Sequence, residues 1–318
     1  MRRIVTVTGE IKPEELGFCH SHEHLSIAKG HCYTIDPAIC IDNTALTLLE
    51  LQSFRQAGGR AIIDAQPVGC GREALVLEAL AKQSGIHIVA STGFHRMLYY
   101  PENHWIFTCQ QAALAQVFID ELTAGMYVCC DLMKPRLRCE SRAGFIKAAL
   151  DGGEMNDRHR KLFTAAALAQ TLTGAALMVH IERDSDPIML ADFLENQKVN
   201  LNAVIFCHMD RMIPDLNVHK ELCARGIYME YDTIARFKYH SDEREAEIVA
   251  EMISAGYENQ LLMGLDVTRR RLCSYSGEVG LGYIRNNFIP LLKQNAVSDS
   301  AIDKIFVRNP ARAFSKEV

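Results

Sequence analysis

The chain has 318 residues, of which 48% are hydrophobic and 23% are charged, and its net charge at pH 7 is -5. This composition is typical of a globular protein, and the length suits one α/β barrel of about 250 residues with insertions. The mildly acidic balance excludes a general electrostatic attraction to nucleic acid or to anionic lipid. We therefore expect neither as a partner.

Cysteine usage and hydropathy indicate the compartment. The opening segment, MRRIVTVTGE, turns polar before an apolar run of signal-peptide length appears. No stretch approaches the roughly 20 apolar residues of a membrane span. The eleven cysteines are scattered and include no C-x-x-C pair. They predict reduced thiols in a cytoplasmic protein rather than a disulfide framework or a zinc ribbon.

Short apolar runs alternate with longer segments of helical pattern, which predicts repeated βα units. Most of these runs lack a polar alternation, as buried parallel strands do. Asn43 is predicted to cap the first intervening helix, and Gly85 and Gly174 to end two others. The predicted strands are residues 17–25, 61–66, 87–92, 145–148, 176–180, 203–208, 226–232 and 260–266.

Eight such strands favour a closed (β/α)8 TIM barrel over an open sheet, with residues 1–318 forming a single domain. One βα repeat separates Lys147 from His180 and His180 from His208, and two repeats separate His208 from Asp266. The interval from His24 to Lys147 is longer than its three repeats require. The surplus, at about residues 94–140, predicts an elaborated loop region after strand 3, beside the barrel mouth.

Four histidines and an acid fall at the ends of predicted strands, where barrels place catalytic groups. His22 and His24 share one face of the first strand because residues i and i+2 point the same way. His180, His208 and Asp266 end three later strands. For any one of these histidines, a side chain satisfied at a strand end is the plainer interpretation. Together they indicate a metal site, since imidazole and carboxylate suit zinc and similar divalent ions.

Lys147 in RAGFIKAAL is the least expected member of this set. Its ammonium group would be repelled by divalent cations. A buried, deprotonated lysine can instead add carbon dioxide and become an anionic carbamate able to bridge two metals. The residues alone leave open the simpler alternative, a lysine that points to solvent from a strand edge.

Several segments, in order over essentially the whole chain, resemble the phosphotriesterase-related family of the amidohydrolase superfamily. They are VTGE, LGFCHSHEHL, RAGFIKAAL, ALMVH, VIFCH, LLMGLD and RNPARAFS. The resemblance implies a hydrolase with two divalent ions, zinc in the first instance and manganese or cobalt as alternatives. The implied ligands are His22, His24 and Asp266 for one ion, His180 and His208 for the other, and Lys147, carboxylated by CO2, between them.

In that family a hydroxide also bridges the two metals. Two cations lower the pKa of bound water, so that hydroxide is available near neutral pH. Asp266 is then expected to take the proton and deliver it to the leaving group. The alternative for Asp266 is a purely structural ligand.

Two basic clusters follow the seventh and eighth strands of this acidic protein. They suit a phosphate or carboxylate, although solvated surface charge is the plain alternative. The candidate substrate-binding residues are Lys238, Arg269, Arg270 and Tyr275. These loops resemble those of a subgroup that hydrolyses phosphorylated sugar lactones. His95 and Arg96, after the third strand, are expected to border the substrate.

The sequence therefore predicts a hydrolase of a small, anionic substrate, with a phosphorylated sugar lactone as the leading class. The alternatives are a lactonase or carboxylesterase for unphosphorylated substrates, with organophosphate triester cleavage as a side reaction. The alternative outside the enzymes is a ligand-binding barrel without turnover. The complete set of metal ligands argues against it. The lactone's stereochemistry, the native metal and the oligomeric state, including a homodimer, stay open.

Overall fold

A sheet of eight parallel strands occupies the centre of the computed structural model, which describes residues 1–317. Each strand overlaps one of the eight predicted ranges, and the predicted α/β barrel is confirmed. The strands are β3 (Cys19–Glu23), β4 (Ala61–Asp64), β5 (His87–Gly93), β8 (Phe145–Leu150), β9 (Ala176–Ile181), β10 (Val204–Cys207), β11 (Tyr228–Tyr231) and β12 (Leu261–Met263).

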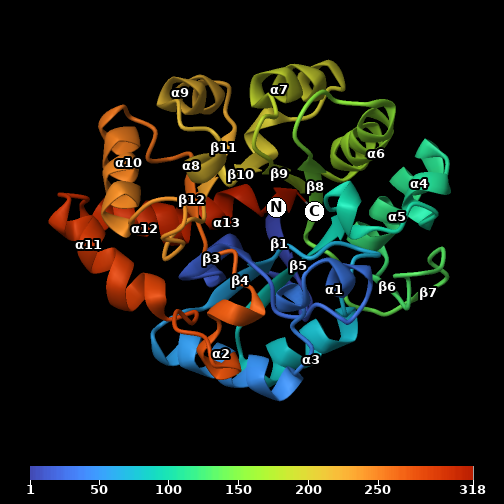
Figure 1. Cartoon of the computed structure of the whole chain (residues 1–318), viewed down its shortest axis with the longest axis horizontal. Helices are drawn as coiled ribbons and strands as arrows, with labels where there is room; N and C mark the ends of the chain where they lie inside the picture. Colours follow the sequence, from blue (N-terminus) through green and yellow to red (C-terminus); the bar gives the residue numbers. More distant parts are fainter. Residues whose placement is uncertain (318) are drawn as a thin grey trace.

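The sheet curls into a nearly closed barrel (Figure 1). Its strand order is β12-β11-β10-β9-β8-β5-β4-β3, so the first and last barrel strands form the two edges. The backbone amide of Asp266 donates to the carbonyl of His22 at 3.0 Å and joins these edges. Two predicted site residues, on the first and last units of the barrel, are thereby held side by side.

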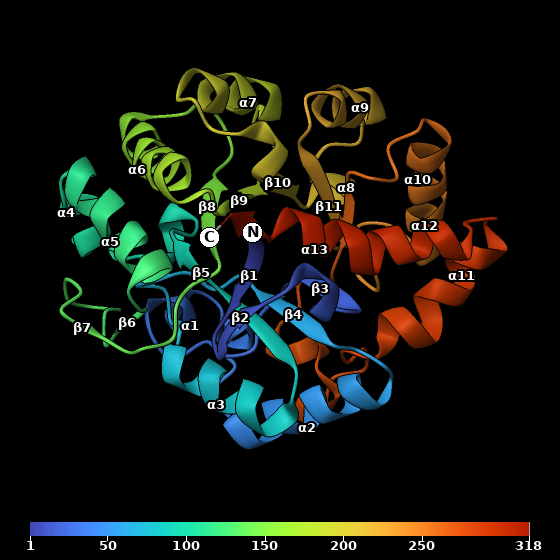
Figure 2. The same ribbon diagram turned by 180° about the vertical axis from the view of Figure 1, so that it is seen from behind.

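Helices surround the strands as an outer ring, seen from both ends of the barrel (Figures 1 and 2). The predicted boundaries at Asn43, Gly85 and Gly174 are confirmed: Asn43 accepts from the amide of Leu46, and the two glycines end their helices with positive φ. The helices are α1 (His31–Ile35), α2 (Thr44–Gln56), α3 (Ala74–Ser84), α4 (Trp105–Thr108), α5 (Gln111–Thr123), α6 (Asp157–Thr173), α7 (Pro187–Asn196), α8 (Met209–Met212), α9 (Leu216–Ala224), α10 (Asp242–Ser254), α11 (Ile289–Gln294), α12 (Asp299–Asp303) and α13 (Asn309–Ala313). Within residues 1–317, none of these helices has both the length and the apolar character needed to cross a bilayer.

One end of the barrel is closed by the two ends of the chain. Strands β1 (Arg2–Thr6), β2 (Gly9–Ile11) and β13 (Lys316–Glu317) form a small antiparallel sheet. The amide of Val7, directly after β1, donates to Ile88 near the start of β5. The ring of Phe314 packs edge-on against Phe145, the first residue of β8. Access to the barrel interior is therefore left at the carboxyl ends of the strands.

The predicted elaboration after the third barrel strand is confirmed. Between β5 and β8 lie α4, the barrel helix α5 and a short hairpin of β6 (Tyr127–Val128) and β7 (Leu137–Arg138). A buried ion pair fixes this region to the barrel. Arg72 contacts both carboxylate oxygens of Glu121 in α5, at 2.8 and 2.6 Å, and also donates to the carbonyls of Ser91 and Tyr127.

Replacing Glu121 by glutamine is expected to lower the free energy of unfolding by about 3–5 kcal/mol, because Arg72 is left buried without its counter-charge. Both side chains of this pair have no solvent exposure. Urea denaturation measures the loss. Glu247→Gln is the control, since Glu247 pairs with Arg244 in an exposed i,i+3 contact on α10. That variant should change the stability by no more than about 0.5 kcal/mol. Equal losses in the two variants would contradict the role assigned to Glu121.

Candidate metal centre and active site

One pocket lies at the carboxyl ends of the barrel strands, with a volume of about 360 Å³. Strands from both halves of the chain supply its floor, so that residues distant in sequence meet there. All six residues predicted as metal ligands line this pocket. They are His22, His24, Lys147, His180, His208 and Asp266.

The first predicted ligand set is compact. His24 Nε2 lies 3.5 Å from Asp266 Oδ1, and His22 Nε2 lies 3.9 Å from the same oxygen. One ligand atom from each residue falls within 4.8 Å of the others. His22 and His24 are on or directly after β3, and the hydrogen bond from Asp266 to the His22 carbonyl brings the acid beside them. These three side chains fit a single divalent ion.

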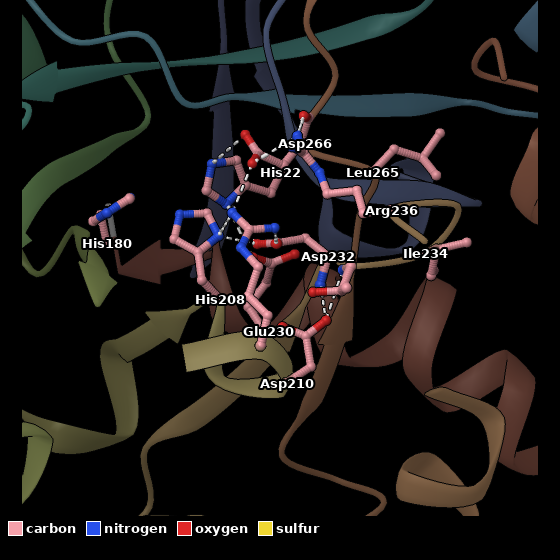
Figure 3. A network of polar contacts seen from close by, with 12 residues as sticks. His22, His180, His208, Asp210, Glu230, Asp232, Ile234, Arg236, Leu265 and Asp266 are labelled. Carbon is pink, nitrogen blue, oxygen red and sulfur yellow. Dashed lines mark hydrogen bonds and ion pairs between the residues drawn. The ribbon is translucent and has the colours of Figure 1, made fainter. Parts of the chain in front are cut away.

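The second predicted set lies beside the first. The rings of His180 and His208 are 4.3 Å apart between centroids, and the rings of His22 and His208 are 5.0 Å apart. His180 is near the end of β9, and His208 directly follows β10. Figure 3 shows His22, His208 and Asp266 facing one another.

The imidazoles of the floor are suited to binding a metal through their lone pairs. Burial lowers the pKa of His22 well below its ordinary value. Burial likewise lowers the pKa of His180, and burial with Arg211 lowers that of His208. These rings are therefore neutral near pH 7, the form in which a histidine binds a metal.

Lys147 lies among these rings rather than facing solvent. Its side chain is fully buried, and its Nζ lies 3.3 Å from His22 Nε2. Within residues 1–317, no carboxylate forms an ion pair with this amino group. A buried ammonium without a counter-charge is unfavourable, and it is more so beside imidazoles that could hold cations. These surroundings fit the anionic carbamate that the family resemblance implies.

A layer of acids behind the floor orients the rings. His22 Nδ1 lies 2.9 Å from Glu230 Oε2, and His208 Nδ1 lies 2.6 Å from Asp232 Oδ2. Glu230 accepts the hydrogen on His22 Nδ1 and leaves Nε2 free to face the pocket, which is the usual arrangement around a metal-binding histidine. At His208, Arg211 Nη2 donates to Nδ1 at 2.8 Å, so Asp232 contacts this ring without accepting its hydrogen. Figure 3 shows Glu230 and Asp232 grouped beside these two histidines.

Three residues around the floor, Glu230, Asp232 and Arg211, were not predicted from the sequence. A signal for the two acids is present in YMEYD, because acids two residues apart on a buried strand share one face. Arg211 follows His208 by three residues, about one helical turn, in the short helix α8. Its side chain is almost fully buried and binds Asp232 and Asp266.

Asp266 is held as an ionised group. Its Oδ2 accepts from Arg211 and from Arg236, each at 2.9 Å. Burial raises the pKa of Asp266, but Arg236, the contact with His24 and Arg211 outweigh it and hold the pKa well below its usual range. His208 and Asp266 both have positive φ, 64° and 48°. Such strained backbone is rare outside glycine and is concentrated at functional sites.

The pocket wall is more polar and includes part of the predicted substrate site. Lys238 and Tyr239 line it from the segment after β11, and His95 and Arg96 line it from the segment after β5. Arg96 is already paired with Glu182, at 2.5 Å, and with Asp151. Lys238 forms no ion pair with any described residue.

The other predicted substrate-binding residues do not line the pocket. Arg269 pairs with Asp42 at 2.8 Å. Arg270 is 76% exposed. The hydroxyl of Tyr275 contacts the backbone of Asn43 and the Thr47 side chain on α2. The sequence places these residues on a catalytic-face loop, but it does not reveal the polar partners that draw two of them toward α2 and the segment before it. Their part in substrate binding stays a prediction.

The fold and the donor set together define a (β/α)8 barrel with a candidate metal centre at its catalytic face. The chain belongs to the phosphotriesterase family, whose sequence profile matches residues 2–314. The resemblance inferred from the sequence motifs is thereby confirmed. Members of this family are hydrolases and generally depend on metal ions, in agreement with the neutral imidazoles and the acid found on the pocket floor.

Known relatives are named for different substrates. The chain is 24% identical to an N-acetyltaurine hydrolase from Danio rerio, covering 98% of this chain and 97% of the relative. It is 27% identical to a phospho-furanose lactonase from Mycoplasmopsis synoviae, covering 98% and 91%. Among solved structures, an amidohydrolase from Mycoplasma synoviae superposes with a TM-score of 0.94 at 25% identity, covering 99% and 92%.

Proposed function

We propose that this hydrolase opens a phosphorylated sugar lactone. One observation carries the proposal: a single pocket has a metal-binding donor set on its floor and an unpaired cation, Lys238, on its wall. Lys238 can thus hold an anionic group of the substrate that lies away from the bond to be cleaved, while the lactone carbonyl contacts the donor set on the pocket floor. The similarity to a phospho-furanose lactonase supports this substrate class.

We also propose how metal is held. His22, His24 and Asp266 would bind one divalent ion, and His180 and His208 a second, with zinc as the leading candidate. Lys147, as its carbamate, would lie between the two. Bound there, the ions would polarise the lactone carbonyl and lower the pKa of water. The full burial of Lys147 without a counter-charge supports the carbamate.

Side chains of the protein itself transfer the proton and orient the groups that take part. Asp266 accepts the proton released when water adds to the carbonyl, and passes it to the ring oxygen as the carbon–oxygen bond of the lactone breaks. Arg211 and Arg236 hold Asp266 in place for both transfers. Glu230 fixes His22 with one ring nitrogen directed to the pocket.

Lys238 is proposed to bind the phosphate. The segment that carries it follows the seventh barrel strand, and barrels often bind phosphate at the loops after strands seven and eight. Arg269, after the eighth strand, can join only by leaving Asp42. The side chains of Arg269 and Asp42 are both partly exposed, so breaking their ion pair to bind a phosphate costs little free energy.

Replacing Lys238 by alanine is expected to lower kcat/KM for a phosphorylated lactone by about 10- to 100-fold, because a charge-assisted hydrogen bond is lost. The matched lactone without phosphate should be affected much less. Initial rates on the two substrates measure the difference. Arg244→Ala is the control, since Arg244 is an exposed cation on α10. Equal losses on both lactones would mean that Lys238 does not bind the phosphate.

The same rate measurements on wild-type protein test the substrate class. We expect the phosphorylated lactone to be preferred over its unphosphorylated partner and over N-acetyltaurine. N-acetyltaurine is included because its sulfonate would also suit Lys238, and because relatives hydrolyse it. A preference for N-acetyltaurine, or none for the phosphorylated lactone, would contradict the proposal.

We further propose a cytoplasmic location, which the eleven free cysteines support.

A further inference from the structure

Three ionisable side chains converge outside the catalytic pocket. Asp210 is in α8, Glu245 is in the first turns of α10, and His240 is in the segment that leads into α10. One ligand atom from each lies within 4.8 Å of the others. None of the three lines the catalytic pocket.

The carboxylate oxygens that face one another in this cluster have no hydrogen-bond donor. Asp210 Oδ2 accepts from the amides of Asp232 and Thr233 at 2.9 and 2.6 Å, but its Oδ1 is buried without a hydrogen-bond partner within residues 1–317. Both carboxylate oxygens of Glu245 are likewise buried without a hydrogen-bond partner within residues 1–317, and this side chain has no solvent exposure.

The histidine presents a third potential ligand atom. His240 Nδ1 lies 3.0 Å from the carbonyl of Ser241, so the hydrogen on Nδ1 is donated there. In the neutral tautomer Nε2 has only its lone pair. Burial lowers the pKa of His240, but Glu245 and the Ser241 carbonyl outweigh it and raise the pKa to about 9, so near pH 7 a metal ion would have to displace a proton from Nε2. Nε2 lies 3.1 Å from Glu245 Oε2 without the geometry of a hydrogen bond.

Such a cluster needs positive charge. Two buried carboxylates that face each other cannot both be ionised without a compensating cation. Either protons or a metal ion must therefore occupy the space between these three groups.

We propose that Asp210, His240 and Glu245 bind a divalent transition-metal ion, separate from the catalytic centre. One imidazole nitrogen and two carboxylates are ligands that zinc and manganese accept, whereas magnesium and calcium prefer oxygen alone. The contact from His240 Nδ1 to the Ser241 carbonyl is the kind that orients a metal-binding imidazole. The His240 side chain is 15% exposed, which gives the ion a path from the surface.

The ion would fix the segment that carries the proposed phosphate site. Lys238 is two residues before His240, and Arg236 is four before it. The ion joins this segment to α8 and α10, whereas the amide of Ala235 is already tied to Asp242 at 2.7 Å. The site does not depend on which substrate the enzyme uses, so its test is a metal count rather than a rate.

The test compares Glu245→Gln with the control Glu243→Gln, which alters an exposed glutamate on the same helix. Each protein is stripped with a chelator, incubated with manganese or zinc, desalted and analysed by plasma mass spectrometry. Wild-type protein and Glu243→Gln should bind about one ion per chain more than Glu245→Gln. An equal count in all three would overturn the proposal, because protons would then be the occupants.

A second variant and a second measurement keep the test decisive if Glu245→Gln does not fold. If circular dichroism shows that Glu245→Gln is unfolded, His240→Gln replaces it with the same expectation. In crystals of wild-type protein grown with manganese, an anomalous difference peak should lie between Asp210, His240 and Glu245. The absence of that peak while the catalytic pocket is occupied would also overturn the proposal.

Discussion

Replacing Lys147 by alanine should remove about two metal ions per chain and nearly all activity. Lys147 is fully buried on the pocket floor, 3.3 Å from His22, with no carboxylate paired to it. If it is the carbamate between two ions, its removal leaves mutually repelling cations without the anion that holds them together. Plasma mass spectrometry of the reconstituted variant measures the loss. The ion proposed at Asp210, His240 and Glu245 should be retained.

The Lys147 variant has two internal checks. A small carboxylate such as acetate or formate, added at high concentration, should restore part of the metal binding and activity because it can occupy the vacated space. Lys82→Ala is the matched control, since Lys82 is an exposed residue on α3, and it should keep its metal. The same metal content in Lys147→Ala and in wild-type protein would show that the carbamate assignment is wrong.

Replacing Asp266 by asparagine should lower turnover by about 10²-fold or more, the usual scale for a general acid–base group. Asparagine keeps an oxygen that can contact a metal but does not readily accept a proton. It also tolerates the left-handed backbone at this position, where φ is 48°. Metal content should therefore fall much less than turnover.

The comparison for Asp266 requires both readouts on one preparation, turnover across pH and metal content. Asp192→Asn serves as the control, because Asp192 is 60% exposed and pairs with Arg225 away from the pocket. Near-normal turnover of Asp266→Asn at every pH would rule out proton transfer. A parallel loss of metal and turnover would instead make Asp266 a structural ligand.

Local sequence signals were sufficient to predict the barrel and the meeting of the four histidines and Asp266 on the pocket floor. Buried parallel strands give apolar runs, and His22, His180 and His208 are conspicuous because each is a polar residue in or directly after such a run. The spacing of these runs in whole βα repeats then places their ends at one face. Lys147 needed the family resemblance, since a lysine on a strand is by itself compatible with a solvent-facing side chain.

The layer around the floor could not be predicted in the same way, because it depends on contacts between distant segments. Arg211 binds Asp266 across 55 residues of sequence. The basic loop after β12 shows the same limit. Its position suggested two arginines and a tyrosine at the mouth, yet Arg269 turns to Asp42 and Tyr275 to Asn43. Charge in a loop predicts attraction to an anion, but not whether that anion is a substrate or a neighbouring aspartate.

The most direct test of the account is the initial rate at which wild-type protein opens a phosphorylated five-membered sugar lactone, measured before and after chelation. We expect rapid ring opening by the metal-loaded protein, its loss when the catalytic ions are removed, and its return when zinc is added back. An unchanged rate in protein shown to be free of metal would contradict the central claim. So would the absence of ring opening by fully loaded protein.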